Sequence, residues 1–178
     1  NQGALNIADS TIANNTASGN NALNQLGGGG ILNEGELNIA NSTIAGNRAA
    51  MSGGGLDNSD GRAWLSNTTI TGNLADSDGD GNGEGGGISV AAGAVLLKNS
   101  IVAGNADTPG NAGASPNAPD LTRKTFSANQ VFFGRVLSRG GNIIGNLGSF
   151  AFDQNGAGDL YGDPNGTTAP NAGATESA

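Results

Sequence analysis

GGGGILN at residues 27–33 opens a unit of sequence that recurs along the chain, and this repeat decides the fold. The unit ends with NSTIAGN at 41–47. Two further copies span 53–73 and 85–105, and a partial first copy spans 5–15. Self-similarity of this kind is typical of architectures in which each repeat packs only on its neighbours.

Within one unit the pattern predicts three short strands separated by turns, at 30–33, 36–40 and 42–45. Alternation of apolar and polar residues places the apolar ones on one face. These inward positions are Leu5, Ile7 and Ile12; Ile31, Leu37, Ile39 and Ile44; Leu56, Ala63, Leu65 and Ile70; and Ile88, Val95, Leu97 and Val102. We therefore expect an all-β fold in which about five or six three-strand coils stack as a single-stranded parallel β-helix.

The composition agrees with a fold made mostly of strands and sharp turns. Glycine (33 residues) and asparagine (25) dominate, and both tolerate the left-handed backbone that sharp corners need. A net charge of −8 argues against nucleic acid as a partner. The chain has no cysteine and no histidine, so it lacks thiolate ligands and the commonest general base. No apolar run approaches the roughly 20 residues of a membrane-spanning helix, so we expect no membrane insertion.

Asparagines form two columns when the copies are aligned. Asn15, Asn47, Asn73 and Asn105 share one position, and Asp9, Asn41, Asn67 and Asn99 share another. We expect both columns at corners, with side-chain amides hydrogen-bonded along the stack as ladders. The alternative reading is that NST at 41–43 and NTT at 67–69 are glycosylation sites.

The copies differ in length at one place, between the Gly-Asn corner and the next glycine cluster. The variable segments are 16–26, 48–52, 74–84 and a longer one after residue 105. We expect all of these loops to project from one edge of the stack, which in repeat folds is often the binding side.

One of these loops, DSDGDGNGE at 76–84, has oxygen-bearing side chains at alternate positions among glycines. The candidate ligands are Asp76, Asp78, Asp80, Asn82 and Glu84. Such a loop can curl around Ca²⁺, and its first six residues follow the EF-hand pattern. Position 12 of that pattern is Gly87 instead of glutamate, however, and flanking helices have no place here. The alternatives are therefore a Ca²⁺ site and a solvated acidic loop, and we expect no other cofactor.

The regular coils are expected over 1–105 of a single domain, followed by a long insertion at 106–139, a last coil at 140–162 and a tail at 163–178. The segment 121–139 holds four of the seven basic residues and three of the five phenylalanines. The outward position of the second strand becomes apolar at Trp64 and Leu96, and an exposed apolar patch needs a cover. We expect 121–139 to lie over that patch.

The order of motifs resembles a group of bacterial surface proteins. The glycine clusters alternating with Ile-x-x-Asn corners resemble the repeats of polymorphic outer-membrane-protein-type β-helices. NSIVAGN at 99–105, PD at 119–120, GNIIGN at 141–146 and GDLYGDP at 158–164 are similar, in this order, to secreted proteins with the choice-of-anchor Q domain. The resemblance implies a right-handed parallel β-helix that is exported or attached to the cell surface, without catalytic residues to carry over.

Two function classes follow, and neither is enzymatic, because acidic residues are sparse on the strands and no paired carboxylates stand out. The first is an extracellular structural protein whose copies join head to tail into a filament or matrix fibre. It rests on strand edges left open at the ends of a solenoid. The alternative is a monomeric adhesin or passenger-type surface domain that binds glycans or cells through its loop edge.

Overall fold

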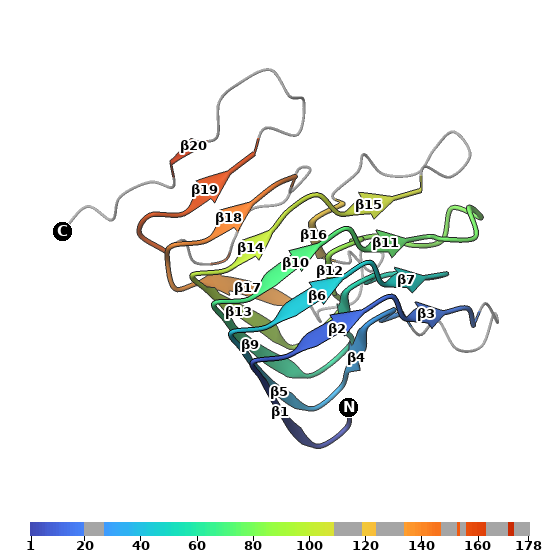
Figure 1. Ribbon diagram of the computed structural model, residues 1–178, viewed down its shortest axis with the longest axis horizontal. Helices are drawn as coiled ribbons and strands as arrows, with labels where there is room; N and C mark the ends of the chain where they lie inside the picture. Colours follow the sequence, from blue (N-terminus) through green and yellow to red (C-terminus); the bar gives the residue numbers. More distant parts are fainter. Residues whose placement is uncertain are drawn as a thin grey trace, which may run out of the picture.

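The computed structural model describes residues 1–19, 27–108, 119–123, 134–146, 153, 156–162 and 171–172. Every regular element in these residues is a β-strand, and the strands form four sheets (Figure 1). Sheet I contains β1 (Ala4–Ala8), β5 (Glu36–Ala40), β9 (Arg62–Ser66), β13 (Ala94–Lys98) and β17 (Arg135–Ser138). Sheet II contains β2 (Thr11–Ala13), β6 (Thr43–Ala45), β10 (Thr69–Thr71), β14 (Ile101–Val102), β18 (Ile143–Ile144), β19 (Leu160–Tyr161) and β20 (Asn171–Ala172).

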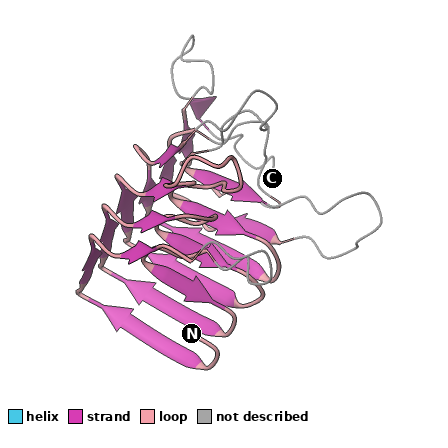
Figure 2. Ribbon diagram, turned by 90° about the vertical axis from the view of Figure 1, so that its right-hand side faces the viewer, coloured by secondary structure: helices cyan, strands magenta, loops and turns pink. Residues whose placement is uncertain are grey.

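The two remaining sheets are made of shorter strands. Sheet III contains β3 (Thr16–Ala17), β7 (Arg48–Ala49), β11 (Leu74–Ala75) and β15 (Ala106–Asp107). Sheet IV contains β4 (Ile31–Asn33), β8 (Leu56–Asn58), β12 (Ile88–Val90) and β16 (Leu121–Arg123). The described pairings are parallel except for the antiparallel pair of β19 and β20. The chain passes through sheets IV, I, II and III in turn and then begins the next layer. Figure 2 shows the strands of successive layers stacked on one another. This stack of parallel sheets fits a β-solenoid.

The sequence predicted three strands per layer, but the regular layers contain four. The regular layers contain a fourth strand in sheet III, such as Arg48–Ala49, at the start of what the sequence suggested was a loop. A strand of two residues is too short to show alternation, so the pattern could not reveal it. The connections after β7 and β11 then leave the stack on the same side (Figure 1).

The predicted inward columns form the core. From Ile31 to Val102 all of them are buried, and most are fully so. The register explains this, because like residues pair along the stack, as Ile44 does with Ile70. The first copy differs: Leu5 is 37% exposed, and Ile7 and Ile12 are partly buried, because the described chain covers β1 and β2 on one edge only.

The asparagine ladder at the end of each sheet II strand is confirmed. The Nδ2 of Asn15 donates to Oδ1 of Asn47 at 2.9 Å, and the same bond links Asn47 to Asn73 and Asn73 to Asn105. Each backbone N donates to the same oxygen. The left-handed backbone lies elsewhere, at the glycine before each corner (Gly46, Gly72 and Gly104) and in the second column, where φ is between 47° and 50°.

The sequence did not indicate a third ladder, which lies at the turn between sheets IV and I. Nδ2 of Asn1 donates to Oδ1 of Asn33, and Nδ2 of Asn33 donates to Oδ1 of Asn58, both at 2.8 Å. Asn33 and Asn58 are fully buried. These bonds satisfy polar groups that would otherwise cost free energy inside the stack.

The glycine clusters are required where sheet IV meets sheet III. A methyl group at Gly54 would lie 2.5 Å from the carbonyl oxygens of Leu74 and Gly86, and one at Gly29 would lie 2.5 Å from those of Arg48 and Gly54. Any side chain would therefore collide with backbone. The clusters thus let the start of each layer pass directly beside its end.

The sequence predicted that the segment 121–139 covers the patch of Trp64 and Leu96, but its two ends form strands of the stack. Leu121–Arg123 extends sheet IV as β16, and Arg135–Ser138 extends sheet I as β17. The prediction for its middle, 124–133, falls outside the described residues. Among the described residues, no helix is long and apolar enough to cross a membrane.

Candidate metal-binding loop

The acidic loop begins directly after β11, where the backbone turns sharply. Asp76 has a φ of 47°, and the backbone N of Gly79 donates to the carbonyl oxygen of Asp76 at 3.0 Å. Gly79 and Gly81 then take φ values of 72° and 83°, which residues other than glycine and asparagine rarely adopt. The glycines of the motif therefore let the loop close on itself.

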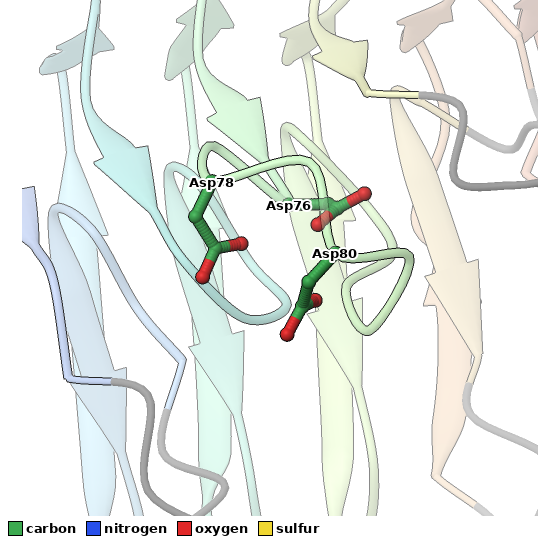
Figure 3. Close-up of side chains that lie close together, drawn as sticks. All are labelled: Asp76, Asp78 and Asp80. Atoms are coloured by element: carbon green, nitrogen blue, oxygen red, sulfur yellow. The ribbon is translucent and has the colours of Figure 1, made fainter.

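The loop buries Asp76 and leaves Asp78 and Asp80 exposed. Both carboxylate oxygens of Asp76 accept the backbone N–H of Gly81 at 3.1 Å. One carboxylate oxygen from each of the three aspartates lies within 4.8 Å of the other two (Figure 3). Three carboxylates from five consecutive residues thus converge at one point.

This convergence is electrostatically unfavourable without a cation. Burial raises the pKa of Asp76, and the nearby charges of Asp80 and Asp78 raise it further, although hydrogen bonds from the backbone of Gly81 and Asp80 partly offset this. A divalent cation would relieve the repulsion, and carboxylate oxygens are the ligands that Ca²⁺ prefers. The donor set therefore fits Ca²⁺.

The structure brings Asp76, Asp78 and Asp80 together but not Glu84. The hydroxyl of Thr122, in β16, donates to Oε2 of Glu84 at 3.4 Å, so this carboxylate lies against the next layer. Asn82 is exposed, and its backbone N donates to Oδ1 of Asp80 at 2.9 Å. Of the five predicted ligands, three thus form the cluster, Asn82 adjoins it through its backbone, and Glu84 lies outside it.

A further acid, Asp107, lies beside this loop and was not singled out from the sequence. It pairs in register with Ala75, the residue before Asp76. Burial raises the pKa of Asp107 to about 6, and the charges of Asp76 and Glu84 contribute. Its Oδ1 is buried without a hydrogen-bond partner among the described residues. The sequence did distinguish Asp107, because the three earlier copies have alanine at this position (Ala17, Ala49 and Ala75).

Comparisons with protein-family models, with curated proteins and with solved structures found no match. The resemblance to surface β-helix repeats therefore stays a prediction.

Proposed function

We propose that the chain is a structural unit of an extracellular filament or surface matrix. The chain would form a right-handed parallel β-helix of about five or six stacked coils. Further copies would join this β-helix head to tail. The stack of parallel sheets supports the proposal, because any layer of such a stack can pair its backbone with another layer.

The observation that carries the proposal is the edge formed by β1, β2 and β3. Among the described strands, each of these three is the last of its sheet and pairs on one side only. Leu5 is 37% exposed there, whereas its register partner Leu37 is fully buried. A further layer placed on this edge would bury Leu5 and satisfy the backbone groups of β1 together.

The ladder of Asn15, Asn47, Asn73 and Asn105, here called the inner asparagine ladder, can also be extended at this edge. Asn15 donates to Asn47 through its backbone N and its Nδ2, but its own Oδ1 accepts no hydrogen bond from the described residues. An asparagine of an added layer would donate to this oxygen. In sheet II the antiparallel β20 ends the parallel series at the opposite edge, so a second copy has to join through the other sheets.

Electron microscopy and light scattering at rising protein concentration test this assembly. Leu5→Lys places a charge in the contact and should abolish filaments. Ile101→Lys is the matched control, because Ile101 is 40% exposed but lies on β14, inside sheet II. Monomeric rods at every concentration would overturn the proposal and favour the alternative, a monomeric adhesin that binds glycans or cells through its loop edge.

We further propose that the loop of Asp76, Asp78 and Asp80 binds Ca²⁺. The converging carboxylates support this, as does the neighbouring buried oxygen of Asp107. Calorimetry with Ca²⁺ alone should show heat of binding for the wild type and none for Asp78→Asn. Asp60→Asn removes an exposed carboxylate elsewhere and should bind as the wild type does. Equal heats for all three proteins would exclude this site.

A further inference from the structure

The outer face of sheet I changes character along the stack. The central outward column reads Asn6, Asn38, Trp64, Leu96 and Leu137. Its first two members are polar and linked by a hydrogen bond of 3.0 Å from Nδ2 of Asn38 to Oδ1 of Asn6. The last three form an apolar strip across β9, β13 and β17, which are neighbours in the sheet (Figure 1).

Basic residues flank this strip on both sides. Arg62 and Arg135 begin β9 and β17. Lys98 ends β13, and Arg139 directly follows β17. All four are exposed, and they are four of the seven basic residues in a chain with a net charge of −8. Within the described part of the chain none of the four forms a salt bridge. Two acids adjoin the strands of the strip: Glu36 is the register partner of Arg62, and Asp153 accepts the backbone N–H of Val136 in β17.

The strip is recessed. Trp64, Leu96 and Leu137 are each partly buried, and a groove of about 280 Å³ lies along Trp64, Leu96, Lys98 and Arg139. Three strands at the usual spacing of about 4.8 Å make the strip about 10 Å long, which suits a short stretch of a linear polymer.

We propose that this face binds an anionic polysaccharide. A pyranose ring has an apolar face of C–H groups that packs against an indole ring or leucine side chains, and its carboxylate or sulfate groups accept hydrogen bonds from arginine and lysine. The cations lie where substituents at the edges of such a chain would meet them. A lipid surface fits less well, because membrane binding requires apolar side chains that protrude, and here the cations are more exposed than the strip.

Trp64 reports binding directly, because it is the single tryptophan of the chain. Titration with polygalacturonate should change its fluorescence in a saturable way, and neutral dextran should have no effect. The double variant Lys98→Gln/Arg139→Gln should weaken binding by about tenfold or more, as expected from the loss of two charge-assisted hydrogen bonds. Dextran sulfate, as a second anionic probe, separates carboxylate from sulfate preference.

Arg48→Gln is the matched control for the single variant Lys98→Gln, because it removes the same charge from sheet III and should leave the affinity within about twofold. Equal weakening in these two single variants would mean attraction by charge alone and would overturn the site. So would a Trp64 signal with phosphatidylglycerol vesicles and none with polygalacturonate. A change in Trp64 emission in Phe132→Ala/Phe133→Ala without any glycan would identify residues 124–133 as the occupant and would also overturn it.

Discussion

Asn105 ends the inner asparagine ladder on the carboxylate of Asp120. The backbone N and the Nδ2 of Asn105 donate to Oδ1 of Asp120 at 2.8 and 2.9 Å, and Oδ2 of Asp120 accepts the backbone N of Asn146 at 2.6 Å. A carboxylate suits this last position because all its neighbours are donors. The backbone N and the Nδ2 of Asn142 donate in the same way to Oδ1 of Asp159, at 2.9 and 3.0 Å.

Asp120→Asn should therefore destabilise the fold although it changes almost no volume. One of the two oxygens becomes an NH₂ group that faces a donor, so a buried hydrogen bond is lost at a cost of about 1–3 kcal/mol. Urea unfolding at neutral pH measures this. Asp9→Asn, on an exposed corner, serves as the control and should change the free energy of unfolding by less than about 0.5 kcal/mol. Equal stability of the two variants would show that the charge of Asp120 is not needed.

Asn73→Ala should cost more than the truncation of an outward asparagine. Asn73 is fully buried, accepts two hydrogen bonds from Asn47, and donates to Asn105 and to the carbonyl oxygen of Ile44. Its loss leaves several buried polar groups unsatisfied, at roughly 3 kcal/mol or more. Asn38→Ala removes one exposed amide bond and should cost about 0.5 kcal/mol or less. Thermal unfolding of both variants would contradict a structural ladder if their midpoints fell by the same amount.

Gly54→Ala should destabilise the stack by about 3 kcal/mol or more, because the added methyl meets the backbone of two neighbouring segments at 2.5 Å. Gly3→Ala is the control, since nothing lies within 4 Å of a methyl group placed there. Denaturant unfolding gives both values. A stable Gly54→Ala protein would mean that sheets III and IV can move apart at this position.

Asp107 should make the protein less stable as the pH rises. Its pKa in the folded state is raised from 3.8 to about 6, so between these values the folded state holds more protons than the unfolded state. Stability then falls from about pH 4 to pH 6 and levels off above, by at most about 3 kcal/mol. The difference in melting temperature between wild type and Asp107→Asn, followed from pH 4 to pH 8 without divalent cations, isolates this contribution. A constant difference would contradict the raised pKa.

The sequence predicted the parts of the fold that repeat with a fixed period. Columns such as Leu37, Ala63 and Val95 could be aligned because each layer needs an apolar residue at the same place. Features that depend on a single non-repeating contact could not be predicted in this way. Leu121–Arg123 follows a segment unlike the repeats, so its pairing with Ile88–Val90 gave no periodic signal.

The same reasoning applies to the candidate site. Alternate acids in a glycine-rich loop predicted the cluster of Asp76, Asp78 and Asp80, because their proximity is local in sequence. The displacement of Glu84 towards Thr122 and the approach of Asp107 depend on the next layer, more than 20 residues away along the chain for both. Only the register of sheets III and IV, which contain Asp107 and Thr122 respectively, places them.

The close contact of Gly54 with Leu74 has a consequence for how the chain tolerates change. Leu74 pairs with Arg48, so the loop that leaves β7 returns at Gly54 beside β11, the neighbour of the strand from which it departed. The distance between the two ends is thus set by the layer spacing and does not depend on what lies between them. Doubling the length of such a loop costs only about 0.6 kcal/mol. Length can therefore vary at the exposed tip of the loop after β11, around Gly79, but not at residues 50–52, which are buried and whose backbone is hydrogen-bonded to the neighbouring layers.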